Sequence, residues 1–272
     1  MIVAAIGWFE NLSAVPGAIV VIGGFVVLSL AFARIVGRLL RAEVLRDHNE
    51  LTGFVFAVIG VIYAVVLGFV AVGVWERFEA AEDRTYDEAS SLAAIYRDAG
   101  SFSNGALLRA DARSYAEHAI QVGWPALAKG QAPPEAPVVE KLARDVHATP
   151  VSGERQAAIF SHMLERSSEA ALDRDARLTE DSTGLNGVMW CVVIAGGFLT
   201  IAFTYLFGFR QTAMQTTMIG TLALLIGLVI FLTMSLDYPF RGPIRVGPDA
   251  FERALTVFDQ IDVADPLTVH TR

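Results

Sequence analysis

Four carboxylates share one side of a helix and could create a surface that attracts cations. Glu76, Glu79, Asp83 and Asp87 follow one another at spacings of 3, 4 and 4 residues, which places them on one helix face. In a ring of subunits this face would form stacked rings of negative charge, which concentrate cations. The alternative is an ordinary solvated helix face. Asp237 is a fifth candidate for an ion-mouth carboxylate, because it ends another long apolar stretch.

These carboxylates directly follow one of four stretches that are long and apolar enough to cross a bilayer, which takes about 20 residues. The stretches cover residues 16–33, 51–75, 188–209 and 213–236, and none of them contains Asp, Glu, Lys, Arg or His. Pumps and coupled transporters usually place ionisable groups at membrane depth. The uncharged stretches therefore argue against a pump and permit a channel with a hydrophobic constriction.

Small residues follow one side of the second apolar stretch. On a helix they fall within a wedge of about 80°, and they are Gly53, Ala57, Gly60, Ala64, Gly68 and Ala71. Small residues let membrane helices approach each other closely. Two interpretations stay open: a packing seam inside one subunit, or a seam around the axis of an oligomer, where the same residues would border a pore.

The fourth stretch carries a polar stripe that begins just before it, formed by Gln211, Gln215, Thr216 and Thr217. Polar side chains at membrane depth either form hydrogen bonds between helices or face water. Hydrogen bonding between helices is the favoured interpretation. In the third stretch, the pair Gly196 and Gly197 is expected to serve helix packing.

The composition excludes several classes of function. Of the 272 residues, 54% are hydrophobic and 18% are charged, whereas a soluble domain carries about 25% charged residues. The formal net charge of −8 argues against a nucleic-acid partner, because phosphate backbones are bound by clustered Lys and Arg. The sequence has one Cys and shows no metal-ligand spacing, phosphate-binding loop or nucleophile motif. We therefore expect no metal, no cofactor and no enzymatic activity.

The apolar stretches divide the chain into four parts. Residues 1–75 hold an N-terminal tail and the first two spans, residues 76–187 form a soluble insert, residues 188–236 hold the last two spans, and residues 237–272 form a C-terminal tail with a short amphipathic helix. The insert has helical spacing without strand-like alternation. The expected fold class is an all-α membrane protein with four transmembrane helices and a helical bundle between helices 2 and 3, formed partly by extensions of those helices.

Arginines in short loops set the expected orientation. Arg34, Arg38, Arg41 and Arg46 follow the first span and Arg210 follows the third, whereas the N-terminal tail has no Lys or Arg. Positive charge collects in the cytoplasmic loops of membrane proteins. The insert, residues 76–187, is therefore predicted to lie on the outer, non-cytoplasmic side of the membrane.

Three motifs carry a family resemblance. They are the run of residues 49–69 continued by residues 74–78, a pattern EA..L..LYR matched by Glu88, Ala89, Leu92, Tyr96 and Arg97, and the run of residues 236–242 with Val246 and Pro248. They bracket nearly the whole chain, which resembles the bestrophin-like domain family of uncharacterised bacterial membrane proteins. The family name implies distant kinship to bestrophins, which are oligomeric anion channels with four membrane helices and a cytoplasmic helical region. The acidic insert, predicted outside, departs from that pattern.

The sequence favours a homo-oligomeric ion channel of the bacterial plasma (inner) membrane, with a pore bordered by the second span and a selectivity that the residues do not resolve. The expected partners are the lipid bilayer and further copies of the chain, and analogy with bestrophins implies a pentamer. The alternative is a non-conducting membrane sensor or scaffold, whose helical insert binds a ligand or a partner.

Overall fold

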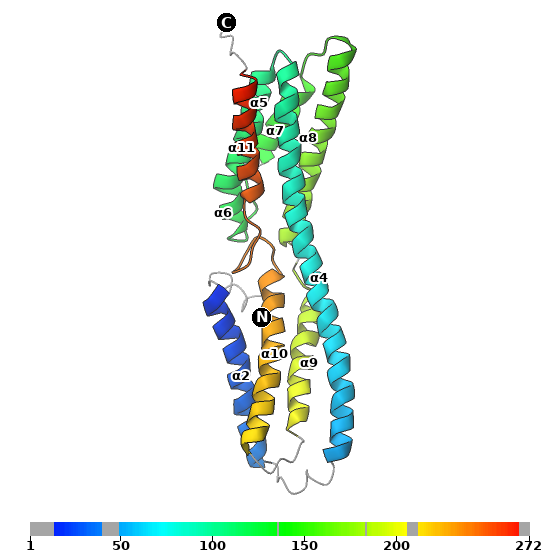
Figure 1. Cartoon of the computed structure of the whole chain (residues 1–272), viewed down its shortest axis with the longest axis vertical. Helices are drawn as coiled ribbons and strands as arrows, with labels where there is room; N and C mark the ends of the chain where they lie inside the picture. Colours follow the sequence, from blue (N-terminus) through cyan, green and yellow to red (C-terminus); the bar gives the residue numbers. More distant parts are fainter. Residues whose placement is uncertain (1–13, 40–48, 135, 183, 206–211, 267–272) are drawn as a thin grey trace. The chain divides into compact units, whose positions relative to one another are not determined.

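The computed structural model describes residues 14–39, 49–134, 136–182, 184–205 and 212–266, and in these ranges it contains no strand. In chain order the helical elements are α2 (Ala14–Leu39), α4 (Asn49–Asp98), the 3-10 turn η2 (Ala99–Ser101), α5 (Gly105–His118), the π-helical segment η3 (Ala119–Gly123), α6 (Trp124–Leu127), α7 (Ala136–His147), α8 (Gly153–Ser182), α9 (Gly187–Thr204), α10 (Thr212–Leu236) and α11 (Asp249–Ala264) (Figure 1). The all-helical fold class is thereby confirmed.

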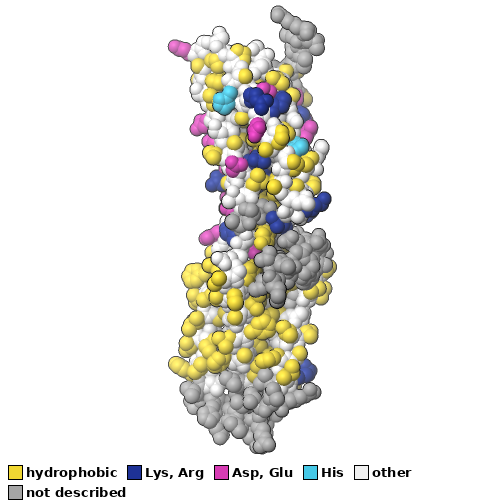
Figure 2. Space-filling model, turned by 180° about the vertical axis from the view of Figure 1, so that it is seen from behind, with side chains coloured by type: hydrophobic (Ala, Val, Ile, Leu, Met, Phe, Trp, Pro, Cys, Tyr) yellow, Lys and Arg dark blue, Asp and Glu magenta, His cyan; other side chains and the backbone are white. Residues whose placement is uncertain are grey.

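Four helices are long and apolar enough to cross a membrane, as the sequence predicts. They are α2, the first part of α4, α9 and α10. The chain divides into two compact units, of which unit 1 comprises Met1–Glu76, Gly184–Asp237 and Gly242–Ile244, and unit 2 comprises Arg77–Thr183, Tyr238–Arg241 and Arg245–Arg272. On the face shown in Figure 2, hydrophobic side chains cover most of the described part of unit 1, and charged side chains are frequent on unit 2.

Helix α4 contributes to both units as one helix of 50 residues. It contains no proline, the residue that most strongly breaks a helix interior. One row of buried positions recurs at spacings of three, four or seven residues, as one helix face requires. It comprises Tyr63, Leu67, Val74, Ala81, Thr85, Glu88, Leu92 and Ile95.

Unit 1 has an apolar core shared by its four helices. Helix α2 packs along α10, where Gly227 lies against Ile22, and Val193 of α9 is fully buried. Helix α9 begins with Asn186, whose side chain accepts a hydrogen bond from the backbone N–H of Val188. This N-cap satisfies one of the amides that the first helical turn leaves without an intrahelical partner.

Unit 2 has a charged pair at the centre of its apolar core. The Arg177 guanidinium of α8 donates to both carboxylate oxygens of Glu88 on α4, at 2.7 and 3.1 Å. The Tyr115 hydroxyl of α5 donates to the same carboxylate at 2.6 Å, and the Trp124 ring of α6 lies 4.8 Å from the guanidinium. Glu88 and Arg177 are both fully buried, so four helices meet at one ion pair.

Two further ion pairs join α4 to α8, Arg77 with Glu180 at 3.9 Å and Arg84 with Asp173 at 3.0 Å. Both pairs keep part of their side chains exposed to solvent. Exposed pairs of this kind contribute little to stability. Glu88–Arg177 is therefore the dominant polar contact between the two helices.

The π-helical segment η3 interrupts the helical path between α5 and α6. Residues 119–123 form this wider turn, and Pro125 follows in the first turn of α6. A proline is tolerated in a first turn, because its missing N–H would have no intrahelical partner there. The wider turn delivers Trp124 to the core, where its indole N–H donates to the Val246 carbonyl at 3.1 Å.

The Glu88–Arg177 pair gives a stability prediction. Glu88→Gln should lower the free energy of unfolding by about 3–5 kcal/mol, because Arg177 would keep its charge in the core without the carboxylate. Glu180→Gln, which removes the partner of Arg77 from a partly exposed pair, is the matched control and should cost less than about 1 kcal/mol. Thermal unfolding of the purified protein in detergent measures both, and equal losses would contradict this role for the buried pair.

Candidate functional site

The small-residue face of α4 does not pack tightly within the described part of unit 1. A methyl group built at Gly60 or Gly68 would meet no atom within 4 Å outside its own helix. Three of the six predicted residues are exposed and three are half-buried; the exposed ones are Ala57, Ala64 and Gly68, and the half-buried ones are Gly53, Gly60 and Ala71. Among the described residues, nothing therefore requires Gly60 and Gly68 to lack a side chain.

Packing inside unit 1 uses another face of α4. The Tyr63 side chain is buried against α9, and its hydroxyl donates to the Val193 carbonyl at 2.9 Å. A methyl group at Gly196 would lie 2.5 Å from the Tyr63 ring, and one at Gly197 would lie 3.0 Å from its hydroxyl. The expected packing role of these two glycines is thus explained, because they make room for Tyr63. At 100° per residue, the small-residue face is about a quarter of a turn from Tyr63.

The predicted mouth carboxylates of α4 are all on its surface. Glu76, Glu79, Asp83 and Asp87 are exposed, on a face about 100° around the helix from the small residues. Asp87 borders a groove of about 380 Å³ between α4 and α8, which Arg84 and Asp173 also line. The small residues and the carboxylates therefore lie on two different faces of one helix.

The described part of the predicted polar stripe lies at the start of α10. Gln215 and Thr216 are half-buried and Thr217 is exposed, whereas Gln211 lies outside the described residues. The Thr217 hydroxyl donates to the Ala213 carbonyl of its own helix at 3.0 Å. That bond satisfies the hydroxyl locally, so Thr217 needs no second helix as acceptor.

Asp237 lies inside unit 1, not on its surface. Its side chain is almost fully buried and accepts hydrogen bonds from the Leu185 backbone N–H at 2.6 Å and from the Trp190 indole N–H at 3.2 Å. The carboxylate thus joins the end of α10 to the start of α9. Hydrogen bonds to a buried charge are among the stronger ones in proteins, which indicates an anchor between two spans.

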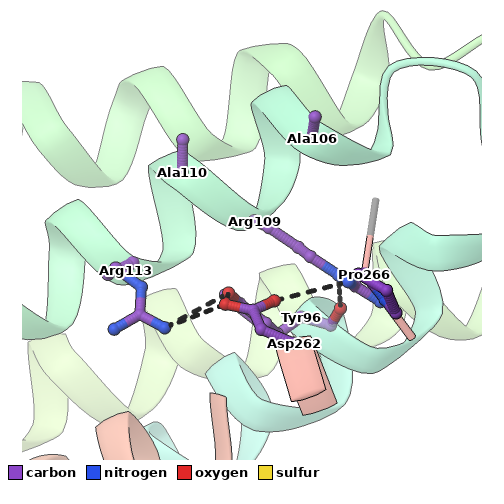
Figure 3. Close-up of a pocket in the computed structure, with 7 residues that line it drawn as sticks. All are labelled: Tyr96, Ala106, Arg109, Ala110, Arg113, Asp262 and Pro266. Carbon is purple, nitrogen blue, oxygen red and sulfur yellow. Dashed lines mark hydrogen bonds and ion pairs between the residues drawn. The ribbon is translucent and has the colours of Figure 1, made fainter. Parts of the chain in front are cut away.

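A cluster of arginines and aspartates in unit 2 is the densest polar site that the sequence analysis missed. Arg109 and Arg113, one turn apart on α5, reach toward Asp262 of α11, and Tyr96 of α4 lies between them (Figure 3). These four residues border a cavity of about 370 Å³. Two effects raise the pKa of the Tyr96 hydroxyl: burial, which is the larger, and the hydrogen bond to Asp262. This group therefore stays protonated.

The sequence holds one signal that could have indicated this cluster. It is the three-residue spacing of aspartates 259, 262 and 265, which places them on one helix face.

A second polar contact joins α5 to α7. The Lys141 ammonium donates to the carboxylates of Asp111 and Asp145. Burial raises the pKa of the Asp111 carboxyl, against the opposing effect of Lys141. The folded state thus binds a proton at Asp111 more readily than the unfolded chain, and this group's contribution to stability falls as the pH rises from the ordinary Asp pKa to the raised one.

Among the described residues, no three His, Cys, Asp or Glu side chains are arranged to hold a metal ion.

The position of Asp237 leads to a prediction that separates an anchor from an ion-mouth carboxylate. Asp237→Ala removes the acceptor of two buried N–H groups and should lower the free energy of unfolding by about 2–4 kcal/mol. Glu79→Ala removes an exposed carboxylate and should leave stability unchanged within about 0.5 kcal/mol. Thermal unfolding in detergent compares the two, and a stable Asp237→Ala protein would contradict the anchor.

Comparisons with known proteins place the chain in a family. The model of the bestrophin-like domain matches residues 23–251. A crystal structure of a bacterial bestrophin homologue from Klebsiella pneumoniae, carrying a point mutation, is similar with a TM-score of 0.63 and 13% identity, over 90% of this chain and 99% of that chain. A variant of a protein described only as a membrane protein is similar with a TM-score of 0.61 and 12% identity, over 89% and 99% of the two chains. No curated protein sequence matches. The chain is a helical membrane protein of the bestrophin-like family.

Proposed function

We propose that this protein is a homo-oligomeric ion channel of the bacterial plasma membrane, with a pore bordered by the small-residue face of α4. The observation that carries the proposal is that a methyl group built at Gly60 or Gly68 would meet no described atom within 4 Å outside the helix, whereas Tyr63 on another face makes the contacts to α9. A face of small residues with open space among the described residues is suited to close approach between copies of the chain.

The chemistry of the spans agrees with conduction through a pore that is gated by its width. The four apolar stretches contain no ionisable residue, so a pore between copies would have apolar and small side chains at membrane depth. Such a constriction controls ion passage by losing its water when it narrows. The family membership and the fold shared with a bacterial bestrophin homologue support a channel over a pump.

The exposed carboxylates of α4 have a separate place in this proposal. Glu79, Asp83 and Asp87 lie about 100° around the helix from the small residues, so they would border the entrance and its sides, not the narrowest part. Their negative potential would raise the local concentration of cations. From the placement of Arg34 and the arginines that follow it, we propose that unit 2 faces outward.

The channel proposal predicts that bulk on the small-residue face stops ion flux. Gly60→Leu and Ala64→Leu should reduce flux at least about ten-fold, because each adds a branched side chain where copies approach each other or the pore. Val65→Leu, an enlargement at an exposed position of the same helix, is the control and should conduct normally. Ion flux into liposomes that contain equal amounts of each purified protein provides the measurement.

Normal flux through Gly60→Leu and Ala64→Leu would remove this face from the pore. If the unaltered protein itself carries no flux, a non-conducting sensor or scaffold, whose unit 2 binds a ligand or a partner, becomes the better reading.

The number of subunits is a second prediction. Native mass spectrometry of the protein released from detergent should show a homo-oligomer of at least three chains, because an axial pore needs several copies of α4 around it. We expect five, by analogy with bestrophins. A monomer would exclude a pore shared between copies.

A further inference from the structure

The first and last parts of α11 are attached to unit 2 in different ways. All four buried residues of α11 lie in its first ten positions: Ala250, Phe251, Ala254 and Phe258. None of residues 259–264 is buried, and Val263 is 85% exposed. Residues 259–265, named here the terminal turns, contain one apolar side chain that packs against the core, the partly buried Ile261.

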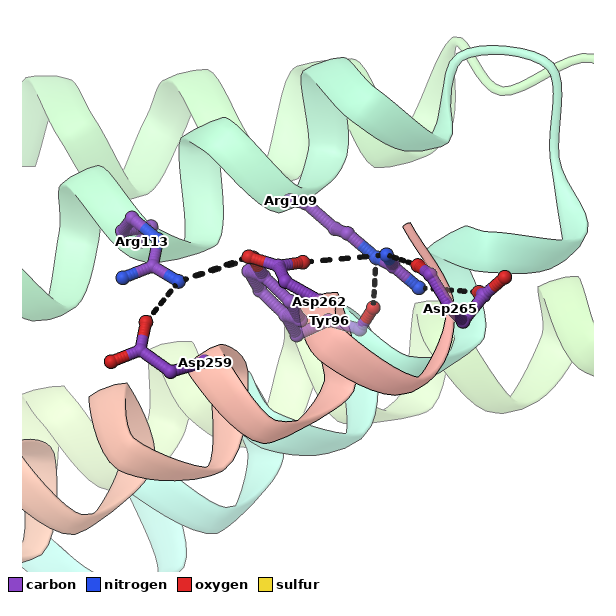
Figure 4. Close-up of polar contacts among 6 residues, drawn as sticks. All are labelled: Tyr96, Arg109, Arg113, Asp259, Asp262 and Asp265. Carbon is purple, nitrogen blue, oxygen red and sulfur yellow. Dashed lines mark hydrogen bonds and ion pairs between the residues drawn. The ribbon is translucent and has the colours of Figure 1, made fainter. Parts of the chain in front are cut away.

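Ion pairs hold the carboxylates of the terminal turns, as Figure 4 shows. Arg109 donates to the Asp265 carboxylate at 2.8 Å and to the Asp265 carbonyl oxygen at 2.7 Å. It thereby also caps the negative end of α11, where helix carbonyls lack intrahelical partners. Arg113 donates to Asp259 at 2.8 Å and to Asp262 at 3.2 Å.

The receiving surface is shaped for these contacts. The Tyr96 hydroxyl donates to the Asp262 carboxylate at 2.6 Å. At Gly100, in the turn after α4, a methyl group would lie 2.7 Å from the Asp265 carboxylate and 2.9 Å from the Arg109 guanidinium. The absence of a side chain at Gly100 is therefore what allows the arginine and the aspartate to meet there.

The two parts of α11 should respond differently to salt. The Phe258 ring stacks on the Tyr96 ring with centroids 4.1 Å apart, and burial of this kind is not weakened by ordinary salt. The carboxylates of the terminal turns keep between 42% and 70% of their surface exposed, so salt screens their attraction to the arginines.

We propose that the terminal turns of α11 form a latch, which opens and closes on Arg109, Arg113 and Tyr96 while the first part of the helix stays bound. Ionic strength sets the balance between the two states. When the latch opens, water reaches the Arg109 guanidinium, which is 5% exposed when it is closed. This regulatory device goes beyond the proposed channel function and does not require it.

Hydrogen exchange of the full-length protein in nanodiscs, read by mass spectrometry, tests the latch. Raising NaCl from about 0.05 M to about 0.5 M shortens the screening length from roughly 14 Å to 4 Å. The amides of residues 259–264 should then exchange about five-fold faster, while those of residues 251–258 stay unchanged. Equal acceleration along the whole helix, or none, would overturn the proposal.

Two variants separate the latch from ordinary fraying of a helix end. Asp262→Asn removes the charge that both arginines share, so residues 259–264 should exchange faster already at low salt and respond less to added salt. Gly100→Ala should have the same low-salt effect, because its methyl group occupies the space where Arg109 and Asp265 meet. Glu252→Gln, which removes an exposed charge from the first turn of the same helix, is the matched control and should behave as the unaltered protein.

Simple fraying would be indifferent to Gly100→Ala, a substitution outside α11. If both variants match the unaltered protein at low salt, the terminal turns are held by something other than this cluster and the latch is rejected.

Discussion

The buried pair of Glu88 and Arg177 is the contact on which unit 2 depends. Two opposite charges taken out of water are stable only where the geometry is good and their remaining hydrogen-bonding groups are satisfied. Here two guanidinium–carboxylate bonds and the Tyr115 hydroxyl satisfy the Glu88 carboxylate, and the Trp124 ring lies over the Arg177 guanidinium. These four groups come from α8, α4, α5 and α6, so the present packing of the four helices is the one that satisfies the pair. A different packing would leave an unpaired charge inside the apolar core.

The spans of unit 1 pack together through apolar and small side chains, without a charged residue inside them. Tyr63 fills the space over Gly196, and its hydroxyl donates a hydrogen bond to the Val193 carbonyl, so a bulky residue and two glycines bring α4 against α9. The same helix has a second face of small residues, on which Gly60 and Gly68 have open space among the described residues. One helix thereby offers one face for folding and another for contact beyond the subunit, which is the basis of the proposed pore.

The motifs that carry the family resemblance contain the buried polar anchors of both units. Glu88 and Tyr96 belong to the second motif, and each is held by a residue from a distant helix, Arg177 and Asp262. Asp237 belongs to the third motif and accepts from Leu185 and Trp190. Polar groups buried in this way tolerate few substitutions, because removing a partner leaves the desolvation cost unpaid. In this chain the buried polar residues of the motifs therefore serve the folding of the two units.

Local patterns were enough to predict the helices. Hydropathy alone marks the four spans, and the lack of a proline from residue 49 to residue 98 predicts one long helix. The spacing of Gly60, Ala64 and Gly68 also predicts that they share a face. These features follow from neighbouring residues, since helix formation and membrane insertion depend on short stretches of chain.

The partners of the polar residues were decided by the tertiary structure. Asp237 looked like a surface carboxylate because it ends a span, yet its donor Leu185 lies 52 positions away. Arg109 meets Asp262 from 153 positions away, and no periodicity connects α5 with the C-terminal helix. Whether a charge ends in water or in the core depends on which distant groups can satisfy it. Neighbouring residues set the helices and their faces, whereas the packing of those helices against one another selects which face is buried and which charge is paired.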